Sequence, residues 1–233
     1  MLSLLRPIPG ITHAHHQWNE IPGHAAYCRL SSLPHLFQTT MISIPSNGPY
    51  LHPDPTRVAT WTERFAAQLP PDTKRIGLAW SGRPTHPNDR PRSISLRRLL
   101  PLASTGKCAF VSLQKPFPAG DVELIGQFPG LADLSGSLTD FEDTAAVIAN
   151  LDMVITVDAS IGHLTGAIGN PAWIILSKAS DWRWLIDRSD SPWYPSVRLF
   201  RQPRCGEWDP VISEVTQALT TLLSSATRDI AAE

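Results

Sequence analysis

Short apolar runs alternate with stretches of helical periodicity along most of the chain. The runs are four or five residues long and bounded by loop-forming residues, which is typical of strands buried on both faces. They cover residues 76–80, 109–113, 131–134, 153–157 and 172–176. Around them, the spacing of apolar residues predicts helices over residues 56–69, 95–102, 121–128, 141–150, 160–168 and 209–223. This alternation predicts an α/β fold with a Rossmann-like, mainly parallel sheet that carries helices on both faces.

The first 54 residues do not follow this alternation. They hold the sequence His-Ala-His-His at 13–16, two proline-rich turns and only short candidate elements. We therefore expect four segments, namely a partial domain at 1–54, a linking helix at 55–70, the main domain at 71–224 and a tail at 225–233. The histidine cluster does not favour a metal site, because adjacent histidines point to different faces and no carboxylate or cysteine is spaced to complete a ligand set.

Composition and charge exclude several kinds of partner. The 233 residues are 42% hydrophobic, enough for one large globular domain or for one domain plus a fragment of another. A formal net charge of -1 offers no basic field for nucleic acid or for an anionic membrane surface. The apolar run at residues 1–10 is broken by two prolines and is too short for a signal peptide or a membrane span. Cys28, Cys108 and Cys205 lack metal-site spacing and indicate a reducing compartment, so we expect the cytoplasm.

The segment from Val157 to Pro171 predicts a phosphate site. Its first residues form the turn between a buried strand and a helix. A helix N-terminus offers unpaired N–H groups and the positive end of a dipole, and open α/β sheets bind ligands at the carboxyl ends of their strands. The alternative is a structural turn in which His163 is simply hydrogen-bonded.

Other polar loops follow the predicted strands. The loop after 76–80 contains Ser81, Gly82, Arg83, Asn88, Asp89, Arg90, Arg92 and Ser93. Its glycine permits close approach of the backbone, and its arginines can clamp phosphate oxygens. Gln114-Lys115 follows the next strand, and Thr139 or Asp140 precedes a helix as an expected N-cap. Because a parallel sheet brings such loops to one edge, we expect them to converge on one site.

Five segments carry a resemblance to a known family, namely GLAWSGRPTHPNDRPRSISL, FVSLQK, DFEDTAAVIANLDMVITVDASIGHLTGAIGNPAWIIL, DWRWLIDRSDSPWYP and VRLFRQP. Together they resemble the carboxy-terminal half of heptosyltransferase-like (family 9) bacterial glycosyltransferases, and especially the branch fused behind tetratricopeptide repeats. The resemblance covers about residues 27–219. It implies a GT-B enzyme, in which two Rossmann-like domains face a cleft and the carboxy-terminal domain holds a nucleotide-sugar donor.

The resemblance also implies roles for individual residues. Those expected against the donor diphosphate are Asp158, Ser160, Gly162 and His163. Those expected to meet it from the opposite loop are Ser81, Gly82 and Arg92. Those expected in the nucleoside pocket are Gln114, Lys115, Asp143 and Thr144. Ala159 stands where many relatives have threonine, which removes a hydroxyl near the phosphate.

The implied reaction is displacement at an anomeric carbon with a nucleoside diphosphate leaving. Arg92, His163 and the helix dipole would stabilise the charge of the leaving group without a metal or other cofactor. The acceptor hydroxyl needs a base, which the family places in its amino-terminal domain. Asp181, on the loop expected nearest the cleft, is the candidate base within this chain.

Residues 1 to about 53 resemble only the last part of that amino-terminal domain. We therefore expect a nucleotide-sugar-binding domain that transfers a glycosyl group to a glycan or protein acceptor when a separately encoded half, or a second copy, completes it. Two alternatives stay open. One is a non-catalytic module that binds a nucleotide or nucleotide sugar, and the other is a GT-B protein of the sugar-nucleotide epimerase kind.

Overall fold

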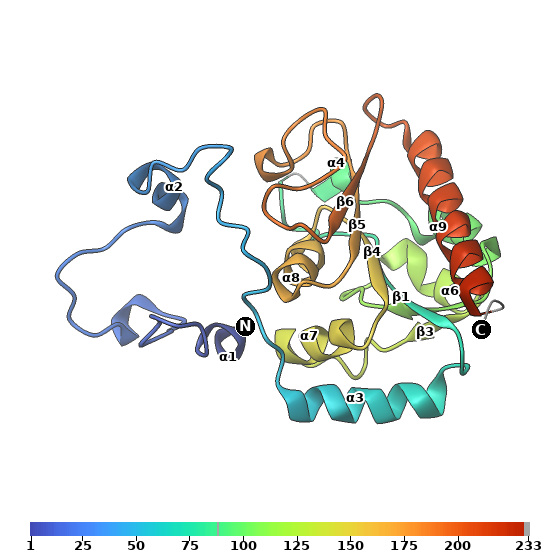
Figure 1. Ribbon diagram of the computed structural model, residues 1–233, viewed down its shortest axis with the longest axis horizontal. Helices are drawn as coiled ribbons and strands as arrows, with labels where there is room; N and C mark the ends of the chain where they lie inside the picture. The colour runs from blue at the N-terminus through green and yellow to red at the C-terminus, as the bar shows by residue number, and fades with distance from the viewer. Residues whose placement is uncertain (88, 231–233) are drawn as a thin grey trace.

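A parallel six-stranded sheet forms the centre of the molecule (Figure 1). The structure is a computed structural model and describes residues 1–87 and 89–230, so Asn88 and residues 231–233 of the expected tail lie outside it. The strands are β1 Lys74–Ala79, β2 Cys108–Ser112, β3 Leu131–Asp133, β4 Met153–Val157, β5 Ala172–Leu176 and β6 Val197–Arg201. Five of them lie within two residues of the predicted runs, and the predicted α/β fold is confirmed.

The strand order is β3-β2-β1-β4-β5-β6. The chain places β2 and β3 on one side of β1 and then returns to place β4 on the other side. Such a reversal leaves a crevice at the carboxyl ends of the two central strands, because the loops that follow them turn in opposite directions.

Strand β6 was not predicted. Its five residues do not form a continuous apolar run, because the exposed Arg198 separates the buried Val197 from the buried Leu199 and Phe200. At an edge, a charged side chain can reach water and discourages pairing with another chain. Here the backbone N–H of Leu199 also donates to the backbone carbonyl of Ser189 at 2.7 Å, so a short segment of the preceding loop covers part of the edge.

The helices follow the predicted pattern, with differences at their ends. The longer ones are α3 Pro55–Gln68, α7 Phe141–Ala149, α8 Ser160–Ile168 and α9 Trp208–Ile230. The shorter ones are α1 Leu2–Leu5, α2 Leu33–Leu36, α4 Asp89–Arg92, α5 Leu96–Leu99 and α6 Val122–Ile125. Single 3-10 turns lie at 18–20, 30–32, 100–104, 119–121 and 182–184.

Three helix predictions were wrong at their ends. The helix expected at 95–102 becomes a 3-10 turn from Leu100, because Pro101 has no N–H to continue the α-helical bonds. The helix expected at 121–128 ends at Ile125, before Gly126. The apolar stripe of α9 ends at Leu223, but the helix continues for seven more residues, to Ile230. Its helical hydrogen bonds continue along this polar segment.

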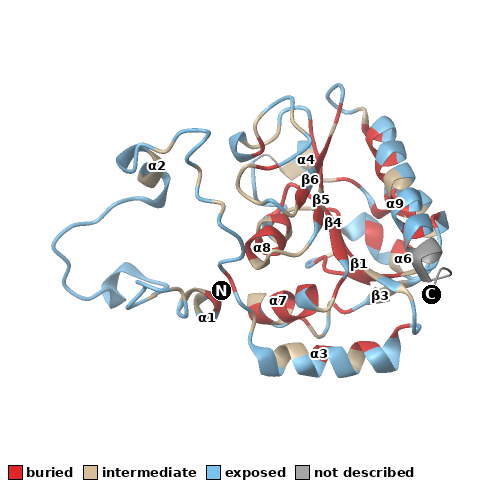
Figure 2. Ribbon diagram, in the orientation of Figure 1, coloured by how far each residue is buried: buried red, intermediate tan, exposed pale blue. Residues whose placement is uncertain are grey.

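The two faces of the sheet are covered by different helices (Figure 2). Alternate β1 residues Ile76 and Leu78 pack with α5, α6 and α9 on one face. The other face packs with α7 and α8, and α3 lies outside α7, burying Trp61 and Phe65. Asp54 caps α3 by accepting the N–H of Arg57 at 2.9 Å, and Pro70-Pro71 follow its end.

Most of residues 1–50 project from this domain as an arm (Figure 1, left), whereas α1 packs on the core beside α7. Leu4 is the one buried residue within this range, while the large apolar side chains of Trp18, Tyr27, Phe37 and Ile42 are exposed. The arm joins the domain at the end of α8, where the N–H groups of Tyr50 and Leu51 both donate to the carbonyl of Ala167, at 2.9 and 3.1 Å. Its interpretation as a partial domain stays a prediction.

Gly169 is expected to be essential at this junction. It ends α8 in the left-handed conformation with φ +86°, and an added Cβ would lie 2.4 Å from Cγ of Pro49. Gly206 has nearly the same φ, +85°, but open space around it, and is a matched control. We expect Gly206→Ala to cost about 1–2 kcal/mol of unfolding free energy through backbone strain alone, and Gly169→Ala about 1–3 kcal/mol more through overpacking. Urea unfolding measures both, and equal losses would contradict the contact with Pro49.

Candidate functional site

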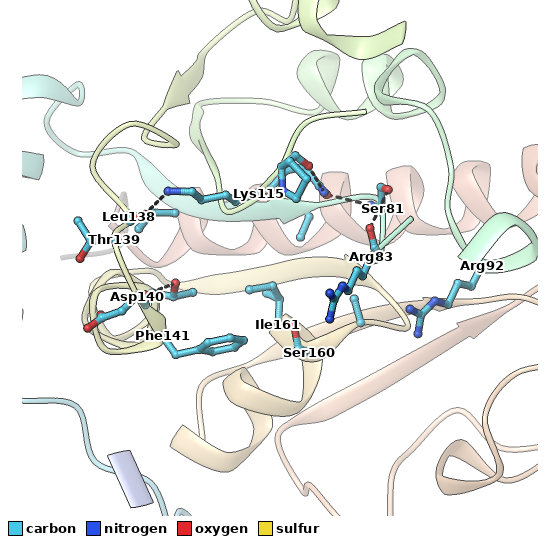
Figure 3. Close-up of a pocket in the computed structure, with 16 residues that line it drawn as sticks. Ser81, Arg83, Arg92, Lys115, Leu138, Thr139, Asp140, Phe141, Ser160 and Ile161 are labelled. Atoms are coloured by element: carbon cyan, nitrogen blue, oxygen red, sulfur yellow. Dashed lines mark hydrogen bonds between the residues drawn. The ribbon is translucent and has the colours of Figure 1, made fainter. Parts of the chain in front are cut away.

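A cavity of about 580 Å³ opens at the carboxyl edge of the sheet, between the ends of β1 and β4 (Figure 3). Four segments line it: the loop after β1, the loop after β2, the start of α7 and the start of α8. The lining residues are Ala79, Ser81, Gly82, Arg83, Arg92, Gln114, Lys115, Pro116, Leu138, Thr139, Asp140, Phe141, Thr144, Ala159, Ser160 and Ile161. Of the predicted site residues, the structure brings together Ser81, Gly82, Arg92, Gln114, Lys115, Thr144 and Ser160 here.

The N-terminus of α8 forms one wall. Its N-cap is Ala159, which has extended backbone angles and no hydroxyl, and no side chain caps the helix. Ser160 is exposed and borders the cavity. The first N–H groups of a helix have no acceptor within the helix, and they carry the positive end of its dipole. This wall therefore presents partial positive charge to the cavity.

Two arginines of the loop after β1 face this wall. Figure 3 shows Arg83 reaching toward Ser160, with Arg92 on the same side of the cavity. The Arg92 side chain is mostly buried, and its Nε lies 3.6 Å from Oδ1 of Asp89 but has no hydrogen-bond partner among the described residues. A mostly buried guanidinium with unused donors is suited to bind an anion.

Gly82 allows the tight packing behind Arg92. A Cβ on Gly82 would lie 2.6 Å from Nη2 of Arg92 and 2.3 Å from Oδ1 of Asp89. The N–H of Gly82 donates to Oγ of Ser93 at 3.0 Å, and this hydroxyl donates to Asp89 at 3.1 Å. The glycine therefore makes room for the arginine side chain that the loop presents to the cavity.

The opposite end of the cavity is held by Gln114 and Lys115. Oε1 of the buried Gln114 accepts the N–H groups of Trp80 at 3.0 Å and Ser81 at 2.9 Å. Nζ of Lys115 donates to the carbonyls of Ser135 and Leu138. Both side chains thus fix the loops that form the cavity. The surface left open at this end includes apolar groups of Pro116, Leu138 and Phe141.

Asp143 lies outside this lining. Its carboxylate accepts Nη1 of Arg57 at 2.7 Å and the N–H of Thr139 at 2.9 Å. Partial burial by itself raises the pKa of Asp143, but the hydrogen bonds from Thr139 and Arg57 outweigh it and lower the pKa. Asp140 caps α7, as expected, by accepting the N–H of Asp143 at 2.9 Å. These contacts fasten α3 to the start of α7.

Asp158 and Gly162 also point away from the cavity. The carboxylate of Asp158 is buried and accepts Nε1 of Trp184 at 2.8 Å and the N–H of Asp181 at 3.4 Å. It therefore holds the loop of residues 181–185 against the end of β4. A Cβ on Gly162 would lie 2.6 Å from Cδ1 of Ile174, so this glycine lets α8 approach β5.

His163 is enclosed by aromatic rings. Its imidazole stacks on Trp184 at 4.8 Å between centroids, and its Nδ1 lies 3.3 Å from the hydroxyl of Tyr194. Burial lowers the pKa of His163, and the nearby charges of Arg183 and Arg92 lower it further against the opposing effect of Asp158 and Asp181. The imidazole is thus uncharged near pH 7. The positive charge at the cavity therefore comes from the arginines rather than from His163.

Asp181, the candidate base, lies on the loop beyond His163. Its carboxylate accepts Nη1 of Arg183 at 2.8 Å and the N–H of the same residue at 3.0 Å. It lines a separate hollow of about 470 Å³ together with Met41, Trp182 and Arg188. Its role as the base stays a prediction.

Sequence reasoning did not select three kinds of residue at this site. Arg83 was noted only as part of a basic loop, although it faces α8. The apolar end of the cavity, with Leu138 and Phe141, has no motif that would reveal it. Tyr194 reaches His163 across 31 residues of sequence, and only the quoted DSPWYP segment pointed to its neighbourhood.

Across residues 1–87 and 89–230, no three histidine, cysteine, aspartate or glutamate side chains gather as a set of metal ligands. In the same part of the chain, no helix combines the length and apolar character needed to cross a membrane.

Comparison with known proteins agrees with this architecture. No protein-family model matches the chain. The family 9 glycosyl transferase from Veillonella parvula superposes with a TM-score of 0.57 and 15% identity, over 76% of this chain and 54% of that one. The ADP-heptose LPS heptosyltransferase II of E. coli superposes with a TM-score of 0.52 and 16% identity, over 75% and 54%. The chain has the fold of these glycosyltransferases. The GT-B-type Rossmann-like fold expected from the resemblance is therefore confirmed.

A curated relative extends the match at the level of sequence. Protein FlbA of Caulobacter vibrioides is 32% identical over 201 residues, which cover 83% of this chain and 32% of FlbA. The chain therefore corresponds to about a third of that relative's length. The match to a tetratricopeptide-linked branch stays a prediction.

The buried position of His163 predicts a pH dependence of stability. Its pKa is lower in the folded chain than the usual 6.5, so the unfolded state takes up the proton first. The contribution of the uncharged His163 to the free energy of unfolding is complete above pH 6.5. It is lost as pH falls through the lowered pKa, and the free energy of unfolding then decreases by no more than about 1.4 kcal/mol per pH unit. We expect unfolding free energies measured from pH 7.5 to 5.0 to fall less steeply in His163→Gln. The exposed His35→Gln is the control, and parallel curves for all three proteins would contradict the prediction.

Proposed function

We propose that the chain binds the diphosphate of a nucleotide-sugar donor in this cavity and serves as the donor-binding domain of a metal-independent glycosyltransferase. One observation carries the proposal: Arg83 and the mostly buried Arg92 face the uncapped N-terminus of α8 across the cavity. A diphosphate offers acceptor oxygens and negative charge, which match guanidinium donors and open backbone N–H groups. The likeness in fold to glycosyltransferases supports the same assignment.

The cavity also suggests an orientation for the donor. The nucleoside would lie toward Pro116, Leu138 and Phe141, where the lining is largely apolar. The glycosyl group would then lie beyond Arg92, on the side of the 181–188 loop. As the bond to the anomeric carbon breaks, negative charge grows on the diphosphate, and the arginines and the α8 dipole stabilise it without reorganisation.

One observation favours the non-catalytic alternative, a module that binds the nucleotide sugar without transferring it. The carboxylate of Asp181 is already paired with Arg183 and does not line the cavity. Donor binding without donor hydrolysis or transfer would select this alternative. The acceptor, and a partner half or second copy that covers the arm, stay predictions from the sequence.

Calorimetry with ADP, UDP and GDP tests the site. We expect at least one of them to bind with a dissociation constant of about 1 mM or lower. Arg92→Ala should weaken it at least about tenfold, because a hydrogen bond to a charged group contributes about 1.5–3 kcal/mol. Arg90→Ala is the matched control, since Arg90 is exposed on the same short helix α4 and does not line the cavity. Affinity unchanged by Arg92→Ala and by Arg83→Ala would overturn the proposed site.

Binding should not depend on a divalent metal. The groups that neutralise the diphosphate here are arginines and backbone N–H groups, whereas Mg²⁺ needs hard oxygen ligands such as carboxylates. We expect the same dissociation constant in EDTA and in magnesium chloride. A loss of binding in EDTA that magnesium restores would show that a cation completes the site.

A further inference from the structure

We propose that the hollow beside the loop of residues 180–188 binds an uncharged sugar ring, with Trp182 as its apolar surface and Asp181 as its hydrogen-bond acceptor. This hollow of about 470 Å³ is separate from the cavity described above and includes Met41 of the arm. Two sources offer such a ring, namely the glycosyl group of the donor and an acceptor glycan. The inference rests on the proposed function for these sources, but free sugars test the hollow without it.

The hollow lies next to the end of the cavity that α8 forms. The N–H of Asp181 donates to Oδ2 of Asp158 at 3.4 Å, and Asp158 directly precedes Ala159, the N-cap that lines the cavity. The charges of Asp181 and of Arg92, which lines the cavity, both act on the imidazole of His163. A group attached to a diphosphate at the start of α8 therefore has this hollow as its neighbour.

The loop that lines the hollow has a strained backbone. Leu185 has φ +53° and ψ -166°, and Asp187 has φ +54°. They are two of the four non-glycine residues with positive φ in the described part of the chain. Such angles are unfavourable for a residue with a Cβ, and they persist where surrounding contacts impose them, often at ligand sites. The contacts that impose them here are therefore part of the proposed site.

Arg201 imposes this conformation from strand β6. Its Nη2 donates to the carbonyls of Trp184 at 3.2 Å and Leu185 at 2.7 Å, and its Nη1 donates to Oγ of Ser180. A guanidinium presents its donors in a fixed planar fork, so one side chain holds two separate parts of the loop. Trp184 is fully buried and anchored through its Nε1 to Asp158 at 2.8 Å. Arg201 is thus a positioning residue for the loop that lines the hollow.

Trp182 and Asp181 offer complementary groups to a ligand. The side chain of Trp182 is 59% exposed, and its Nε1 has no partner among the described residues. Asp181 accepts the N–H and Nη1 of Arg183 through Oδ1 alone, which leaves its Oδ2 without a partner in the same part of the chain. The guanidinium of Arg183 also lies 4.8 Å from the centroid of the Trp182 ring and fixes the two side chains relative to each other.

An uncharged sugar matches this combination. Its C–H groups can pack on an aromatic surface, while its hydroxyls donate to a carboxylate and accept from an indole N–H. Binding sites for small molecules have the same character, with an apolar lining and a few placed polar groups. An anion fits less well, because Asp181 is negative and the nearby arginines are paired. Arg188 donates twice to Asp190, at 2.9 and 2.6 Å, as Arg183 does to Asp181.

Nucleotide sugars test the donor as the source of the ring. Calorimetry compares ADP-glucose, UDP-glucose and GDP-mannose with ADP, UDP and GDP. If the glycosyl group of the donor occupies the hollow, Trp182→Leu should weaken the best nucleotide sugar about fivefold and leave its nucleoside diphosphate within twofold. Trp18→Leu makes the same change at an exposed tryptophan of the arm and should change neither.

Free sugars test the hollow itself. We expect saturation-transfer NMR of the ligand-free protein to detect binding by at least one methyl glycoside of glucose, galactose, mannose or N-acetylglucosamine. Trp182→Leu and Asp181→Asn should each reduce the signal several-fold. Displacement by the nucleotide sugar, but not by the nucleoside diphosphate, identifies the ring as that of the donor. A signal that persists beside the bound nucleotide sugar identifies it as that of an acceptor.

Arg201→Lys tests the positioning role. We expect it to weaken sugar binding several-fold and to leave nucleoside diphosphate binding within twofold, whereas Arg198→Lys, on an exposed side chain of the same strand, should change neither. If Arg201→Lys does not fold, the variants at the more exposed Trp182 and Asp181 decide. The proposal is overturned if no sugar of either kind binds, or if binding is unaffected by Trp182→Leu and Asp181→Asn. If no nucleoside diphosphate binds, the proposed function fails, while the methyl glycosides still decide the hollow.

Discussion

The parallel pairing of β1 with β4 is the contact on which the candidate site depends. The register of Ile76 with Met153 and of Ala79 with Thr156 joins segments separated by nearly 80 residues. It places the loop that carries Arg83 and Arg92 opposite the start of α8. Neither side alone would form a strong anion site, since one is a loop with basic residues and the other a helix terminus. Together they give fixed positive groups around one cavity, because the sheet sets their separation.

Two buried carboxylates hold the loops around this edge, and both do so through an indole N–H. Asp121 accepts Nε1 of Trp80 at 2.8 Å and the N–H of Leu96 at 3.1 Å. Asp158 accepts Nε1 of Trp184 in the same way at the end of β4. A buried carboxylate is costly unless hydrogen bonds satisfy it. Each pair therefore fixes a loop at a defined place, and the ligand contact expected of Asp158 from its position in the motif stays a prediction.

The sequence could reveal what depends on local pattern and on general rules of topology. The run at 153–157 and the stripe of α8 were predicted with the bounds that the structure has, because apolar periodicity is read directly from neighbouring residues. The convergence of Ser81, Gly82, Arg92 and Ser160 followed from the rule that parallel strands end at the same edge. Neither inference required knowledge of a distant side-chain partner.

Pairings between distant residues could not be predicted in this way. Asp143 is tied to Arg57 across 86 residues, and Asp158 to Trp184 across 26. A carboxylate in a motif looks the same whether it faces a ligand or a buried indole, and only the packed structure separates the two. Strand β6 was missed for a related reason: the exposed Arg198 is accommodated at the edge of the sheet, and Arg201 donates to the carbonyls of Trp184 and Leu185.

Helix α8 joins the arm to the cavity. Its first residues border the cavity, and its last turn accepts the N–H groups of Tyr50 and Leu51 and packs Gly169 against Pro49. The helix is only nine residues long and makes close glycine contacts with β5 and Tyr194. The arm and the cavity therefore contact opposite ends of one short helix, so the place where the arm attaches and one wall of the cavity are parts of the same element.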